Sequence, residues 1–316
     1  MIDTINKTSG VWPVMLTPFT EDNQVDAEGL KFLVEWYIQN NVSGMFAACQ
    51  SSEIFNLSLR ERLNIARITI EQTNGRVPIV ASGNTSDSLQ DQADELNSMW
   101  KLGADAVVLL SNRLAGRHEN AQVWIENLKK LLDLLDPDMK LGIYECPYPY
   151  KRVISPEEME AIIASGRFCF IKDTCSDSLV IRRKLAQMKG TGIRLFNANT
   201  TTLLGSLRDG ADGYCGVMAN FHPELYVWLC SNIRNKNAEK VSDVLTMCSL
   251  IEKQLYPTNA KWHLRNLRNV PIQDYCRVQD SSLLTETFKQ EITAMERLVK
   301  DTYDTYCLNG QGMTQR

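Results

Sequence analysis

Short apolar segments alternate with longer amphipathic segments eight times between residues 11 and 233, and this alternation limits the folds open to the chain. The short segments are apolar at nearly every position, as in parallel strands covered on both faces. The long segments carry apolar residues at helical spacing. Eight strand-helix units of this kind predict an α/β fold, a closed parallel (β/α)8 TIM barrel with its helices outside. The predicted strands cover residues 11–19, 44–49, 78–83, 104–110, 140–146, 168–174, 193–197 and 213–218.

The predicted helices follow the strands one by one. Capping boxes mark two of their starts, Ser58 with Glu61 and Ser155 with Glu158, the second with Pro156 at the first helical position. An open doubly wound sheet is the alternative, but the number of units and the absence of a GxGxxG motif after the first strand favour the barrel. The helices are predicted over residues 26–41, 58–74, 86–102, 119–135, from 155 onward, 177–188, 201–208 and 223–233.

The alternation stops near residue 235, which predicts two parts. Residues 10–235 are expected to form a catalytic barrel, and residues 236–316 a C-terminal helical appendage. The apolar faces of the appendage are expected to pack on the barrel or on a partner subunit. The helices of the appendage are predicted over residues 241–255, 259–267 and 283–303.

Charge and cysteine content exclude several classes of function. With 34 basic and 38 acidic residues, the net charge of -4 gives no electrostatic reason to bind nucleic acid or an anionic membrane. Nine scattered cysteines without a CxxC pair predict buried thiols in the reducing cytoplasm. Three histidines far apart in the sequence predict no metal site, and no segment has the pattern of a targeting or membrane-spanning sequence. A small-molecule partner, with no metal or organic cofactor, is expected.

Catalytic groups of such a barrel stand at the carboxyl ends of its strands, and one of these ends carries a lysine. Lys172 lies in the apolar segment 168–174, where an unpaired charge would cost several kcal/mol by order of magnitude. One interpretation is a buried stem with the ammonium in water. The other is a desolvated amine with a lowered pKa, which can attack a carbonyl and form a Schiff base.

Neighbouring strand ends supply groups that suit this chemistry. Tyr144 ends the adjacent predicted strand, and Ser51 and Ser52 follow the second. A phenol can move the protons that imine formation requires, and hydroxyls with nearby N–H groups can bind the carboxylate of a 2-oxo acid. Taken singly, Tyr144 is also explained as a packed core residue and the two serines as a turn. Their joint position favours the catalytic interpretation.

Six segments at the strand ends resemble a known family, that of dihydrodipicolinate synthase and N-acetylneuraminate lyase, Schiff-base enzymes of the pyruvate aldolase type. The resemblance implies that Lys172 forms the imine, Tyr144 transfers protons and Ser51 binds the oxo-acid carboxylate. It also implies a lyase or aldolase that acts on a C–C bond of a pyruvate-derived 2-oxo acid, and a homodimer or homotetramer. The segments are VMLTPFTEDNQVD (14–26), CQSSEIFNLSLRER (49–62), VPIVASGNTS (77–86), IYECP (143–147), FIKDTCSD (170–177) and GADGYCGVMAN (210–220). Further candidates for contact with substrate are Gln50, Ser52, Arg113, Asn199, Cys215 and Asn220.

The chain departs from the family pattern at several strand ends. After the second strand, Gln50 replaces the first of two hydroxyl residues and Ser52 replaces a glycine. A carboxamide cannot relay a proton as a hydroxyl does. After the seventh strand, Ala198 stands in place of a glycine.

Two other departures concern the synthase branch of the family. Ser111 takes the place of a tyrosine that the synthases lend across a dimer interface, and Pro149 takes that of an arginine for the second substrate. Lys151 and Arg152 are the candidates to replace that arginine. The alternatives left open are a dehydratase of a sugar-derived 2-oxo acid, dihydrodipicolinate synthase itself, and a barrel that binds 2-oxo acids without turnover.

Overall fold

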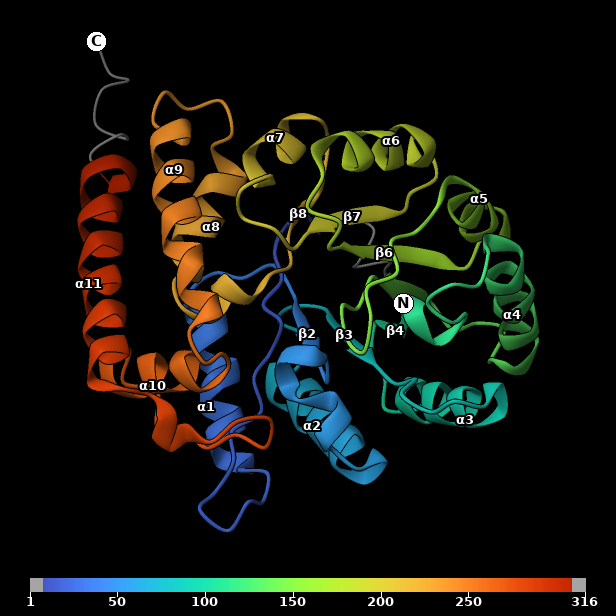
Figure 1. The fold of residues 1–316 in the computed structure, drawn as a ribbon, viewed down its shortest axis with the longest axis horizontal. Coiled ribbons are helices and arrows are strands. Elements are labelled where there is room, and N and C mark those ends of the chain that lie inside the picture. The colour runs from blue at the N-terminus through green and yellow to red at the C-terminus, as the bar shows by residue number, and fades with distance from the viewer. Residues whose placement is uncertain (1–7, 309–316) are drawn as a thin grey trace.

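A computed structural model of the chain describes residues 8–308 and contains eight parallel strands. Their order in the sheet is β1-β8-β7-β6-β5-β4-β3-β2. The segment after β1 then pairs with β2 through Val14 and Phe46, which closes the sheet into a barrel (Figure 1). The predicted TIM barrel is confirmed. The strands are β1 (Gly10–Val11), β2 (Met45–Ala47), β3 (Ile79–Ser82), β4 (Ala106–Leu110), β5 (Leu141–Tyr144), β6 (Phe168–Asp173), β7 (Arg194–Asn197) and β8 (Gly213–Tyr214).

A helix follows each strand on the outside of the barrel (Figure 1). The predicted capping boxes of α2 and α5 are confirmed, with Ser58 and Ser155 as the N-caps and Glu61 and Glu158 as their partners. These local hydrogen bonds fix where each helix begins. The barrel helices are α1 (Ala27–Gln39), α2 (Leu59–Thr73), α3 (Leu89–Trp100), α4 (Ala121–Leu134), α5 (Pro156–Ser165), α6 (Ser178–Met188), α7 (Leu203–Arg208) and α8 (Pro223–Ser231).

The first strand is much shorter than predicted. Regular pairing covers Gly10–Val11 instead of residues 11–19, because Pro13 has no N–H to give to a neighbouring strand. Backbone bonds from Phe46 N–H to the Pro13 carbonyl and from Met15 N–H to the Phe46 carbonyl still close the barrel. The predicted helix 86–102 also begins later, at Leu89, because Ser88 is its N-cap.

The C-terminal segment is helical, as predicted, and includes the long helix α11 (Glu286–Thr302), which continues into the π-helix η8 (Tyr303–Leu308). The helix expected over residues 241–255 is wrong at its end, because α9 (Ala238–Cys248) gives way to the 3-10 helix η6 (Ser249–Lys253). Helix α10 (Thr258–Leu267) follows. Apolar residues of this tail belong to the same hydrophobic core as the barrel residues. The division between residues 235 and 236 stays a prediction.

A buried ion pair ties the tail to the barrel. The Nζ of Lys261 on α10 lies 2.7 Å from a carboxylate oxygen of Glu53, which follows β2, and both side chains are inaccessible to solvent or nearly so. The other oxygen of Glu53 accepts backbone N–H groups of Arg277 and Val278, at 2.6 and 3.0 Å. These bonds place residues 275–279 over the mouth of the barrel.

Replacing Lys261 with methionine is expected to lower the free energy of unfolding by about 3–5 kcal/mol, because it leaves the buried carboxylate of Glu53 without its countercharge. Urea unfolding followed by circular dichroism measures this. Lys289→Met is the matched control, since Lys289 forms only a surface pair at 4.0 Å from Glu286 and should change stability by less than about 1 kcal/mol. Equal stability of the two variants would contradict the role given to the Glu53–Lys261 pair.

Candidate active site

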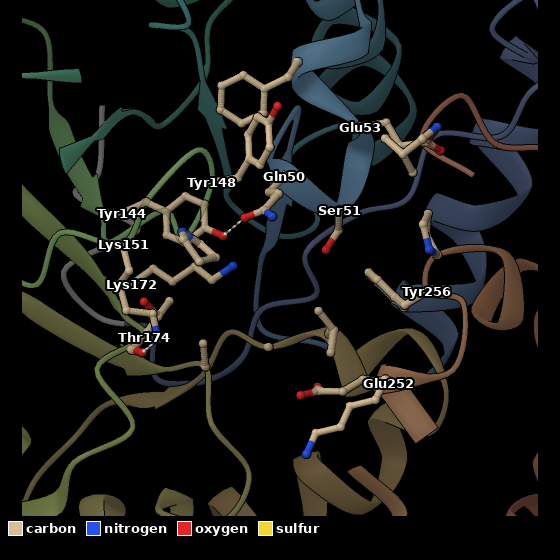
Figure 2. Close-up of a pocket in the computed structure, with 18 of the residues that line it drawn as sticks. Gln50, Ser51, Glu53, Tyr144, Tyr148, Lys151, Lys172, Thr174, Glu252 and Tyr256 are labelled. Atoms are coloured by element: carbon tan, nitrogen blue, oxygen red, sulfur yellow. Dashed lines mark hydrogen bonds between the residues drawn. The ribbon is translucent and has the colours of Figure 1, made fainter. Parts of the chain in front are cut away.

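A cavity of about 910 Å³ opens at the carboxyl ends of the strands. Its volume lies at the upper end of the range of small-molecule sites, roughly 300–1,000 Å³, and leaves room for a ligand larger than pyruvate. Barrel strands supply one wall and the C-terminal tail supplies the other (Figure 2). Residues that line it include Gln50, Ser51, Phe55, Tyr144, Tyr148, Lys151, Lys172, Ala198, Asn199, Glu252, Lys253, Tyr256, Arg277 and Gln279.

Lys172 and Tyr144 stand together in this cavity. Their Cα atoms are register partners in the β5–β6 pair, so both side chains leave the same face of the sheet. The Nζ of Lys172 lies 4.1 Å from the centre of the Tyr144 ring and 5.5 Å from that of Phe46. Only 4% of Lys172 and 3% of Tyr144 is exposed. The side chain of Lys172 is therefore almost wholly enclosed, with its Nζ over aromatic faces.

The phenol of Tyr144 is buried and holds its proton firmly. Burial raises its pKa well above the usual value, and the nearby thiols of Cys146, Cys49 and Cys215 raise it further. Its hydroxyl donates a hydrogen bond of 3.2 Å to Oε1 of Gln50. The group that replaces the family's first hydroxyl thus contacts the tyrosine directly.

A buried triad fixes the ends of β5 and β6. Glu145 and Asp173 directly follow Tyr144 and Lys172, and both carboxylates contact Nζ of Lys184 on α6, Asp173 at 2.5 Å. All three side chains are buried. Burial raises the pKa of Glu145 against the opposing effect of Lys184, whereas for Lys184 the two carboxylates outweigh burial and raise its pKa. The triad holds the two strand ends in one register.

In the turn after β2, the side chains of the two predicted serines point in different directions. Ser51 lines the cavity, and its side chain bonds with Tyr256 from the tail. Ser52 is fully buried outside the cavity, where its hydroxyl donates to the Met15 carbonyl at 2.6 Å and accepts the Cys49 N–H at 3.1 Å. Successive residues of a 3-10 helix point in different directions, so only one of them can face the cavity. The side chain of Ser52 therefore stabilises the turn.

The remaining candidates fall into two groups. Asn199 lines the cavity, whereas Cys215 is fully buried in the barrel interior, which raises the pKa of its thiol to about 12. Asn220 is also fully buried, with its amide on the Val14 carbonyl and Tyr256. Arg113 pairs with Asp87 away from the cavity. The side chains of Asn220 and Arg113 are thus committed to other contacts.

The structure also shows the contacts of the residues that differ from the synthase branch. Ser111 is buried, and its hydroxyl donates to the Arg152 carbonyl at 2.9 Å. The guanidinium of Arg152 binds Glu158 and backbone carbonyls outside the cavity. Lys151 lines the cavity and donates to the Thr174 carbonyl at 2.7 Å. Of the two candidates for the missing arginine, only Lys151 can reach a ligand.

Several residues of the tail wall were not predicted from the sequence. Glu252 and Lys253 on η6 and Gln279 after α10 line the cavity opposite Lys172. Loss of surrounding water raises the pKa of Glu252, with Lys253 opposing the shift. The strand-end rule cannot find these residues because they do not belong to the strand-helix repeat.

Within residues 8–308, no three histidine, cysteine or acidic side chains lie close enough together to hold a metal ion. None of the helices in that same range has the length and apolar character to cross a bilayer. The prediction of a site without metal remains a prediction.

The chain forms an eight-stranded barrel, and a lysine at the end of the sixth strand lies in a cavity at the strand ends. This is the architecture of a class I aldolase or lyase. Residues 7–295 match the sequence profile of the Dihydrodipicolinate synthetase family. The chain therefore belongs to that family of pyruvate-dependent aldolases and lyases.

Known relatives are distant. 4-Hydroxy-tetrahydrodipicolinate synthase 1 of Clostridium acetobutylicum is 25% identical over 283 residues, 86% of this chain and 92% of that protein. A sialic acid aldolase from Ruminococcus gnavus superposes with a TM-score of 0.85 at 14% identity, covering 97% of this chain and 99% of that one. YagE of Escherichia coli K12, in a complex with pyruvate, superposes with a TM-score of 0.81 at 21% identity, covering 92% and 98%. The two structures establish the fold.

Replacing Lys184 with methionine is expected to lower the free energy of unfolding by about 3–5 kcal/mol near neutral pH, because two buried carboxylates lose their countercharge. The folded-state pKa of at least one carboxyl then rises further, so the folded chain binds more protons than the unfolded chain. The free energy of unfolding should therefore fall more steeply with rising pH than in the wild type.

Urea unfolding at about pH 5 and about pH 8 measures this difference. Lys189→Met is the control, because Lys189 is exposed just beyond the same helix. A Lys184→Met variant as stable as this control at both pH values would contradict the role of the triad.

Proposed function

We propose that the chain is a Schiff-base lyase or aldolase that cleaves or forms a C–C bond of a pyruvate-derived 2-oxo acid. Lys172 is the nucleophile, Tyr144 the general acid and base, and Ser51 with the N–H groups of its turn the binding site for the carboxylate. The observation that carries the proposal is the buried Nζ of Lys172 beside the Tyr144 ring, inside the cavity. Family membership supports it.

The proposed reaction begins with the neutral amine of Lys172. Its lone pair attacks C2 of the 2-oxo acid while the phenol of Tyr144 gives its proton to the carbonyl oxygen. Loss of water leaves an iminium ion between Nζ and C2. In cleavage, the phenolate of Tyr144 takes the proton of the C4 hydroxyl, the C3–C4 bond breaks, and its electron pair moves toward the iminium. An aldehyde leaves, and protonation at C3 followed by hydrolysis releases pyruvate.

Three alternatives share parts of this site. A dehydratase would use the same iminium to expel water from a sugar-derived 2-oxo acid. Dihydrodipicolinate synthase itself is disfavoured by Ser111 and Pro149, because neither supplies the phenol or the guanidinium of that branch. A barrel that binds 2-oxo acids without turnover is motivated by Gln50, which cannot relay a proton.

Reduction with borohydride in the presence of pyruvate is expected to leave a stable 1-carboxyethyl group on Nζ of Lys172, because hydride reduces the imine to a secondary amine. Mass spectrometry of tryptic peptides locates the adduct. Lys172→Ala should abolish it, and Lys31→Ala, at a lysine on α1 whose side chain is 43% exposed, should leave it intact. A folded wild type without an adduct from any 2-oxo acid tried would refute the proposal.

Product analysis then separates the alternatives. Incubation with a panel of sugar-derived 2-oxo acids should release pyruvate and an aldehyde, whereas a dehydratase would give a product lighter by one water. Turnover should be lost in Lys172→Ala and strongly reduced in Tyr144→Phe. Thermal stabilisation by 2-oxo acids without consumption of any would instead favour the binding barrel.

A cytoplasmic location is part of the proposal. The nine cysteines are all free, and six of them are buried. Free thiols in such number are typical of a reducing compartment.

We expect the chain to form a homodimer or homotetramer. Apolar side chains remain exposed on the C-terminal half, including Met247 (63%) and Leu250 (50%) on the tail. Covering such side chains stabilises an assembly. Gel filtration with light scattering should give a multiple of the chain mass of 35.8 kDa, and a species of that mass alone would contradict the expectation.

A further inference from the structure

Gln50 occupies a rigid position at the cavity. It begins the 3-10 helix η2 (Gln50–Ser52) directly after β2. The hydroxyl of Ser52 anchors this turn on the carbonyl of Met15, and the Ser52 N–H bonds back to the Cys49 carbonyl. Gln50 lines the cavity next to Ser51. Its carboxamide is therefore presented from a fixed backbone.

The hydroxyl of Tyr144 determines how the carboxamide of Gln50 is oriented, because it donates to Oε1 at 3.2 Å. The thiol of Cys146 lies 3.5 Å from the same oxygen and 3.3 Å from the Tyr148 carbonyl, and its single proton can be given to either acceptor. Nε2 then lies on the side of the group away from Tyr144, toward Ser51 (Figure 2).

The two N–H groups of Nε2 are unused within the protein. Among residues 8–308, none accepts a hydrogen bond from this nitrogen, although Gln50 is partly enclosed by the cavity wall. A donor pair beside the hydroxyl of Ser51 suits a carboxylate, because charge-assisted hydrogen bonds are stronger than neutral ones.

We propose that Nε2 of Gln50 donates a hydrogen bond to the carboxylate of the bound 2-oxo acid, while Oε1 holds the phenol of Tyr144. This inference rests on the function proposed above. The same amide links recognition of the carboxylate with the orientation of the proton donor. Because a carboxamide passes no proton, Tyr144 exchanges its proton with the substrate and not with Gln50.

The test compares pyruvate with methyl pyruvate, which has the same ketone but no carboxylate charge, in the borohydride trapping reaction. Gln50→Met removes both hydrogen-bonding ends at similar length. It should raise the half-saturating concentration of pyruvate about ten-fold or more and that of methyl pyruvate less than about two-fold. Gln50→Glu places a second negative charge beside the carboxylate and should weaken pyruvate binding further.

Gln90→Met is the control, since Gln90 is exposed on α3 and bonds only to Asp94 within that helix. It should match the wild type with both probes. An unchanged half-saturating concentration of pyruvate in Gln50→Met, or an equal shift for both probes, overturns the inference while leaving Lys172 as the nucleophile. Absence of any adduct in the wild type overturns the proposed function and this inference with it.

Discussion

The ion pairs between Lys184 and the two carboxylates Glu145 and Asp173 are the interaction on which the site depends. Each charge alone would be costly at this depth, so the three groups are stable only in mutual contact. That contact requires β5, β6 and α6 to lie in one arrangement. The residues directly before the two acids are Tyr144 and Lys172, and the same arrangement therefore brings the phenol and the amine together. The polar groups beneath the site fix its geometry and do not themselves line the cavity.

A second buried pair extends this principle to the tail. Glu53 and Lys261 join the turn after β2 to α10, and the backbone of residues 277 and 278 completes the contact. The tail is thereby part of the cavity wall as well as of the core. Residues of η6 and residues near Gln279 line the cavity together with the barrel residues. Variation in the tail is thus a means of changing which ligand fits the cavity while the barrel wall stays the same.

Gln50 stands where the family has a hydroxyl residue, and this changes the hydrogen-bond partner of Tyr144. A longer side chain on the same turn reaches the phenol and accepts its proton in a hydrogen bond, but cannot take the proton away. The buried Ser111 offers no second phenol in its place. Gln50 therefore orients the phenol of Tyr144 but cannot carry its proton away.

The apolar periodicity and the helix-capping residues of the sequence were enough to predict the barrel and the starts of α2 and α5. They also predicted the strand ends that carry Lys172 and Tyr144, because parallel strands of a barrel end on one rim. The local sequence pattern was not enough to predict the direction of single side chains or the contacts between segments far apart in the chain. It could not tell that Ser51 faces the cavity while Ser52 faces Met15. Nor could it show that Glu252 and Gln279 return to the mouth of the barrel. Only the tertiary structure decided these points, since they depend on contacts between segments far apart in the chain.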